Sequence, residues 1–152
     1  MTQPGLPPPP PRIELVEGPL DNTNLDLERE FAYALARIEK RRGARWRSDV
    51  PVLKVAVRTE WELFQRRARY RIAHGGDGVQ RPTVRGLTWP ESAFTILTPL
   101  ATAEDVRHEV GHFLAWRLLD VGPGPASEVI AVECEGPALF EALADLVRGW
   151  FS

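Results

Sequence analysis

The stretch TAEDVRHEVGHFLAWRLLDV, residues 102–121, decides how the rest of this 152-residue sequence is interpreted. Thr102 is a residue type that caps helices, and Glu104 and Asp105 follow in the first turn, where the helix dipole favours acidic side chains. The stretch therefore predicts a long helix. Within it, residues 108–112 read His-Glu-Val-Gly-His, which is the pattern H-E-x-x-H.

The two histidines of this pattern are spaced to bind one metal ion. Residues four positions apart lie on the same face of a helix, so the imidazoles of His108 and His112 can reach a common ion. Glu109 is turned about a third of a revolution away from them. Zinc lowers the pKa of a bound water, and a nearby carboxylate can then take its proton. The motif predicts a catalytic zinc site with Glu109 as the general base.

A zinc site needs a third protein ligand, and the residues leave several candidates open. The metzincin spacing is absent, because Ala115 and Leu118 stand where that pattern needs glycine and histidine. Cys134 has no matching ligand motif around it. The remaining candidates are acidic: Glu128, Glu133, Glu135, Glu141 and Asp145. The last two are favoured because they lie four apart on a largely apolar predicted helix, where unpaired carboxylates are costly to bury. An exposed acidic stripe is the alternative.

HEVGH followed by FEALADLV, residues 140–147, resembles the gluzincins, the thermolysin-like zinc metallopeptidases. The resemblance covers residues 83–150 and is closest to the minimal members, the minigluzincins. It implies one Zn²⁺ per chain, bound by His108, His112 and Glu141. It also implies that Asp145 hydrogen-bonds the outer nitrogen of His108.

The same resemblance implies a fold and an activity. The expected fold is α+β and zincin-like: a small mixed sheet with backing helices, an active-site helix and a C-terminal helix that bears the third ligand. The expected activity is endopeptidase hydrolysis by metal-activated water, on a peptide or protein substrate. One strand matches the edge strand that lines the substrate cleft in such enzymes, and its residues are Phe94, Thr95, Ile96, Leu97 and Thr98. An interior strand with both edges paired is the alternative.

Two other functions remain open. In size and motif the chain also resembles small intracellular H-E-x-x-H proteins that cleave transcriptional repressors, which implies a regulatory metalloprotease with one protein substrate. The second alternative is a non-catalytic zinc-binding interaction module. It is favoured because no His or Tyr follows His112, where the gluzincin resemblance implies a side chain that stabilises the oxyanion. Other possible donors cannot be placed from the sequence: Tyr33, Tyr70, His74, Arg85 and Arg148.

The sequence predicts one domain over residues 12–152, which follows a Pro-rich, disordered tail at residues 1–11. Hydrophobic periodicity and turn residues predict strands over residues 12–17, 50–58, 83–89 and 93–98. They predict helices over residues 24–42, 59–72, 102–121 and from 137 to the chain end. Residues 122–127 predict a break, and residues 128–134 are ambiguous between helix and strand.

Composition limits the partners and the compartment. The net charge of −2 argues against binding nucleic acid through bulk positive charge. Residues 37–71 are basic, however, which indicates a solvated helix face or a patch for an acidic partner. The longest uncharged hydrophobic stretch, residues 92–103, is too short to span a membrane. Cys134 is the one cysteine, which fits a reducing compartment. We therefore expect a cytoplasmic protein, monomeric by default, with no nucleic-acid or membrane partner.

Overall fold

The computed structural model describes residues 10–73, 86–137, 147, 149 and 150, and they form a mixed α+β fold. This confirms the α+β part of the predicted fold. The elements, in chain order, are β1 (Ile13–Glu17), α1 (Leu27–Arg42), β2 (Leu53–Val57), α2 (Glu60–Ala73), β3 (Gly86–Trp89), the 3₁₀ turn η1 (Pro90–Ser92), β4 (Phe94–Leu97), α3 (Ala103–Leu119) and α4 (Pro125–Glu135). Residues 1–9 of the predicted tail and most of the final predicted helix lie outside the described residues.

The four described strands form one sheet in the order β1-β2-β4-β3. β1, β2 and β4 are parallel, and β3 runs antiparallel to β4. β4 therefore pairs on both sides, and the prediction that residues 94–98 form an edge strand is wrong. The reason is that β4 has two neighbours. The η1 turn, after which Ala93 adopts a left-handed conformation (φ 52°), folds it back along β3, and its other edge pairs in parallel with β2. Thr98, just beyond β4, is fully buried.

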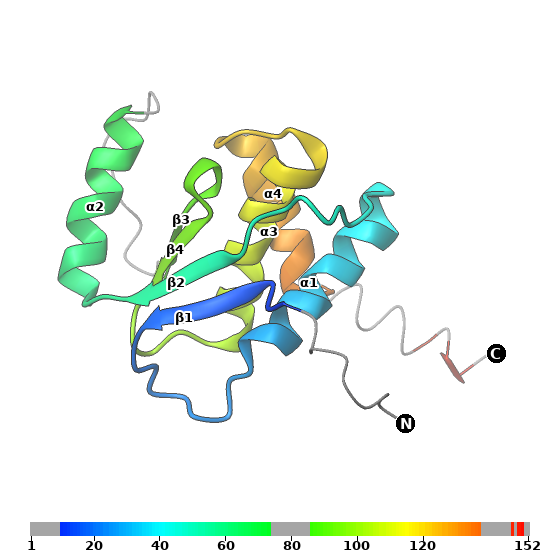
Figure 1. Cartoon of the computed structure of the whole chain (residues 1–152). Helices are drawn as coiled ribbons and strands as arrows, with labels where there is room; N and C mark the ends of the chain where they lie inside the picture. The colour runs from blue at the N-terminus through cyan, green and yellow to red at the C-terminus, as the bar shows by residue number, and fades with distance from the viewer. Residues whose placement is uncertain (1–9, 74–85, 138–146, 148, 151–152) are drawn as a thin grey trace.

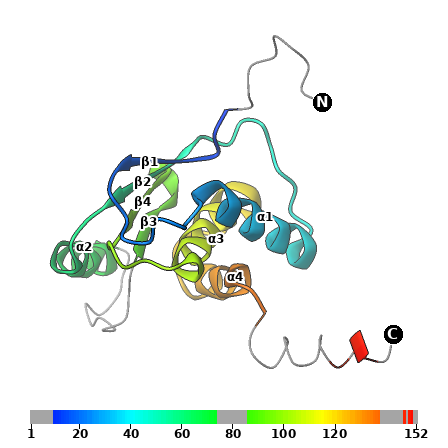
Figure 2. The same cartoon turned by 90° about the horizontal axis from the view of Figure 1, so that it is seen from below.

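Helices cover both faces of the sheet (Figures 1 and 2). α1, α3 and α4 lie on one face, where the largest core cluster joins them to the strands and where Phe31 of α1 meets Phe113 of α3. α2 lies on the other face, near β3. Leu63 of α2 packs there against Leu87 and Ile96 in a smaller cluster. The sheet therefore presents its polar threonines of β3 and β4 to α3.

Local signals fix the limits of α3, as the sequence predicts. The Thr102 side chain accepts a hydrogen bond from the Asp105 N–H, and the Asp105 carboxylate accepts one from the Thr102 N–H. α3 ends where Asp120 takes a left-handed conformation (φ 55°). α4 begins only a few residues later, at Pro125, because proline suits the first position of a helix. Residues 125–135 are thus one helix, where the sequence predicts a break and an ambiguous segment.

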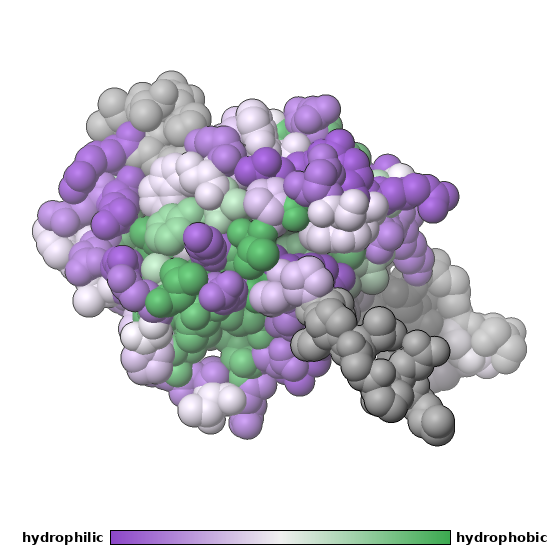
Figure 3. Space-filling view, in the orientation of Figure 1, coloured by the Kyte–Doolittle hydropathy of each residue, from purple (hydrophilic) through white to green (hydrophobic). Residues whose placement is uncertain are grey.

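The other edge of the sheet, β1, exposes hydrophobic side chains. Leu15 is 40% exposed and Val16 is 45% exposed. In Figure 3, hydrophobic residues gather over and below this strand, with hydrophilic residues among them. Among the described residues, no helix has both the length and the apolar character needed to cross a membrane.

Candidate metal centre

α3 and α4 bring the histidines of the motif against the start and the end of α4. His112 contacts Ser127 and His108 contacts Glu135, so the two helices run antiparallel. Their close approach depends on the glycine of the motif. A Cβ added at Gly111 would lie 2.8 Å from the Cα of Ala131, much closer than an ordinary contact. The contact of α3 with α4 therefore requires glycine at this position.

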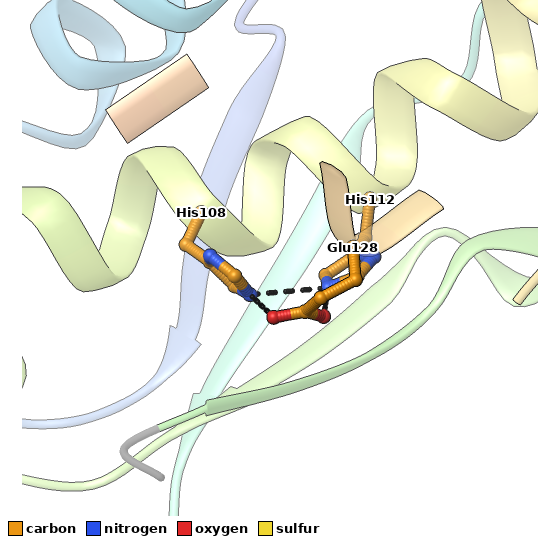
Figure 4. A group of neighbouring side chains, drawn as sticks. All are labelled: His108, His112 and Glu128. Carbon is orange, nitrogen blue, oxygen red and sulfur yellow. Dashed lines mark hydrogen bonds and ion pairs between the residues drawn. The ribbon is translucent and has the colours of Figure 1, made fainter. Parts of the chain in front are cut away.

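Three side chains converge between the helices: His108, His112 and Glu128 (Figure 4). The two Nε2 atoms are 3.2 Å apart. Glu128 Oε1 lies 3.1 Å from His108 Nε2, and Glu128 Oε2 lies 3.0 Å from His112 Nε2. Bond lengths to zinc of about 2 Å separate the ligands of a tetrahedral site by roughly 3.3 Å. The donor set and its spacing therefore fit a zinc ion with two imidazoles and one carboxylate.

The outer nitrogens of both rings are also bonded. His108 Nδ1 is 2.6 Å from Glu135 Oε1, and His112 Nδ1 is 2.7 Å from the hydroxyl oxygen of Ser127. A proton held at Nδ1 by such a partner leaves Nε2 free to bind a metal. In the described part of the chain, Glu135 makes the contact with His108 that the gluzincin resemblance implies for Asp145. Asp145 and Glu141 lie outside the described residues.

The charges of the centre favour a cation. Burial lowers the pKa of His108, but its hydrogen bond to Glu128 and the negative charges of Glu109, Glu128 and Glu135 outweigh burial and raise that pKa to about 9. Hydrogen bonds from His108 and His112 hold the pKa of the Glu128 carboxyl well below its usual range. The Glu128 side chain is 59% exposed, so the centre opens to solvent on its side.

Glu109, the remaining charged residue of the motif, contacts the sheet. It is buried, and its Oε1 accepts a hydrogen bond of 2.8 Å from the hydroxyl of Thr88 on β3. Gly86 of β3 leaves room for it, because a Cβ at Gly86 would lie 2.6 Å from Glu109 Cγ. Glu109 is thus not one of the three converging donors, and its expected role as the general base stays a prediction.

Arginines fix the C-terminal end of α4. Arg42 of α1 forms two hydrogen bonds with the Glu133 carboxylate, at 2.8 and 2.7 Å. Arg107 of α3 donates to the main-chain carbonyl of Glu135 at 2.7 Å and pairs with the buried Glu30 of α1. Glu133 is therefore engaged with α1, whereas the Glu135 carboxylate stays beside His108.

The sequence includes Glu128 among five open candidates but does not select it. Glu128 and Glu135 are seven residues apart, which places both on one face of a helix. This spacing would have indicated both residues as partners of the histidines if residues 125–135 had been predicted as a helix. Of the possible oxyanion donors, the Tyr33 ring lies 4.2 Å from the Arg107 guanidinium carbon. The side chains of Tyr70, His74, Arg85 and Arg148 lie outside the described part of the chain.

Comparisons of this chain with models of known protein families, with curated proteins and with solved structures found no match. The assignment of the site rests on the geometry of His108, His112 and Glu128. The residues around them supply the remaining support: partners for both outer nitrogens, and the buried carboxylate of Glu109, which directly follows His108 on α3.

Proposed function

We propose that this chain is a zinc-dependent peptidase with a zincin-like fold. The observation that carries the proposal is the convergence of the two motif histidines with Glu128, at 3.0–3.2 Å between donor atoms. His108, His112 and Glu128 would hold one Zn²⁺. This set of ligands leaves a fourth position open, as catalytic zinc sites do.

We assign each protein group a role in this proposed reaction. When bound, zinc would lower the pKa of a water molecule and polarise the carbonyl of a peptide bond. Glu109 takes the proton from the attacking water and later delivers it to the leaving amine. Glu135 and Ser127 keep the imidazole rings in the orientation that presents Nε2.

β3 is a better candidate than β4 for binding an extended peptide. In the described part of the chain, β3 pairs with β4 alone, so its second edge can accept another strand. β3 also lies directly beside α3, since Thr88 bonds Glu109. A peptide that adds to this edge would pair through its main chain, with little demand on its side chains. We therefore propose that β3, and not residues 94–98, binds the substrate peptide.

The third ligand is tested by measuring zinc in variants. Glu128→Ala should lose most of the zinc that the wild type binds, about one ion per chain. Glu133→Ala is the matched control. This variant should keep its zinc, because Glu133 pairs with Arg42 of α1 and not with the histidines. Glu141→Ala tests the ligand implied by the gluzincin resemblance. An empty site in Glu141→Ala with a full site in Glu128→Ala would overturn our assignment.

Catalysis is tested with zinc-loaded protein and unfolded casein as substrate. Wild type should hydrolyse casein, and Glu109→Gln should be slower by about 10²–10⁴-fold while it keeps its zinc, since it lacks a general base. Equal inactivity of both zinc-loaded proteins would contradict a general peptidase. It would favour the non-catalytic zinc module or a protease restricted to one protein substrate.

A further inference from the structure

A chain of buried hydroxyl groups runs from the sheet to Glu109. Thr88 of β3 and Thr95 of β4 are partners across the two strands, and their hydroxyl oxygens are 2.7 Å apart. The Thr88 hydroxyl is 2.8 Å from Glu109 Oε1 and 3.3 Å from the main-chain carbonyl of Glu109. Both threonines are almost fully buried, at 5% and 1% exposure. The chain therefore lies in the interior between the sheet and α3.

The direction of these hydrogen bonds follows from their chemistry. A carboxylate only accepts hydrogen bonds, and a hydroxyl has one proton to donate. Thr88 therefore donates to Glu109, and Thr95 must donate to Thr88.

The two oxygens of Glu109 thus have different surroundings. Oε1 is bonded to Thr88, whereas Oε2 accepts no hydrogen bond from the described residues. A Cβ added at Gly86 would lie 3.1 Å from Oε2, so β3 also leaves the space that this oxygen occupies. We propose that Thr88 is a positioning residue, which holds Oε1 so that Oε2 is presented as the base, with Thr95 supporting it from β4.

The consequence for catalysis rests on the proposed function. β3 is also the strand proposed to hold the substrate, so one short strand would set the positions of both the peptide and the base. A misplacement of about 1 Å between reacting groups can cost roughly 10²-fold in rate. Coupling both positions to β3 limits such misplacement.

The hydrogen bond itself is tested without any activity, by a double-mutant cycle on the metal-free protein. Thr88→Val should lower the urea midpoint in the wild type, and at least half of that loss should disappear in the Glu109→Ala background. Thr98→Val is the control, because its buried hydroxyl has no partner among the described residues and its loss should not lower the midpoint. Equal losses from Thr88→Val in both backgrounds would overturn the proposal.

Positioning is tested by kinetics of the zinc-loaded protein. Thr88→Val should lower kcat by at least about 10-fold with unchanged KM and zinc content, and Thr88→Ser should recover most of the rate. Full activity in Thr88→Val, or no recovery in Thr88→Ser, would contradict positioning by the hydroxyl. If the zinc-loaded wild type does not hydrolyse casein, general peptidase activity is contradicted, and the urea cycle still decides whether Thr88 holds Glu109.

Discussion

At the scale of single residues, His108 links the two ends of α4. Its Nε2 lies 3.1 Å from Glu128, in the first turn, and its Nδ1 lies 2.6 Å from Glu135, in the last. Both carboxylates favour the imidazolium form and help to raise the pKa of His108 to about 9, against the effect of burial. A metal ion must displace this proton before Nε2 can bind it.

Zinc affinity should therefore depend steeply on pH. When the pH is below the His108 pKa of about 9, His108 is protonated in the metal-free protein. Zinc binding should therefore tighten about tenfold for each pH unit between pH 6.5 and that pKa. Competition with a chelator at several pH values measures this dependence, after correction for the protonation of the chelator. NMR titration of metal-free protein should place the His108 midpoint near 9, and Glu128→Gln should lower it. A midpoint near 6.5 would contradict the assignment of charges.

The hydrogen bond between Glu135 and Nδ1 of His108 can also be tested. Glu135→Gln should weaken zinc binding by roughly 10–100-fold with the fold retained, because it removes the carboxylate that orients His108. Asp145→Asn is the matched comparison, since the gluzincin resemblance gives Asp145 this role. Chelator titrations of both variants decide between them. A loss of affinity in Asp145→Asn alone would show that Glu135 is not the orienting group.

At the scale of elements, the centre depends on how closely α3 approaches α4. Gly111 faces Ala131 and Cys134 across this contact, and a Cβ added to it would lie 2.8 Å from the Cα of Ala131. The obstructing atom belongs to the main chain of α4. A side chain at position 111 can therefore be accommodated only if one helix moves.

Gly111→Ala should thus destabilise the protein by about 1–3 kcal/mol, the usual cost of overpacking a tight contact. The same movement should separate Glu128 from the histidines and weaken zinc binding. Urea unfolding of the metal-free variant measures the first effect, and zinc titration measures the second. Wild-type values in both measurements would mean that the helices do not meet as closely as described.

The sequence predicts some elements better than others, for physical reasons. α3 carries its own capping box, so local residues define where it begins. α4 is harder to predict because Gly122, Pro123 and Gly124 precede it and suggest a longer break than exists. The position of β4 inside the sheet depends on pairing with β2, a strand roughly forty residues away, and no local pattern reveals such a partner.

At the scale of the whole molecule, zinc should tie α4 to α3 and so stabilise the fold. A ligand at a hundred times its Kd stabilises the native state by about 2.7 kcal/mol if it does not bind the unfolded chain. Adding zinc to metal-free protein should raise the Tm by several degrees. His112→Ala should show little or no rise, since it lacks one of the ligands. An equal rise in both proteins would place the stabilising zinc elsewhere.

The candidate metal centre can be predicted from sequence only where its residues lie on one helix. His108, Glu109 and His112 are neighbours on one helix, so their relation is fixed by helical geometry alone. Glu128, Ser127 and Glu135 join them only through packing of α4 against α3. The carboxylates of this region look alike in sequence, and their roles differ because Arg42 engages Glu133 while the histidines face Glu128 and Glu135.

The most direct test of the central claim is anomalous diffraction at the zinc edge from crystals of the zinc-loaded protein. Our account predicts one strong peak about 2 Å from His108 Nε2, from His112 Nε2 and from a carboxylate oxygen of Glu128. A peak bound by Glu141 in place of Glu128 would contradict the ligand assignment. The absence of any peak at the two histidines would contradict the metal centre and the function proposed from it.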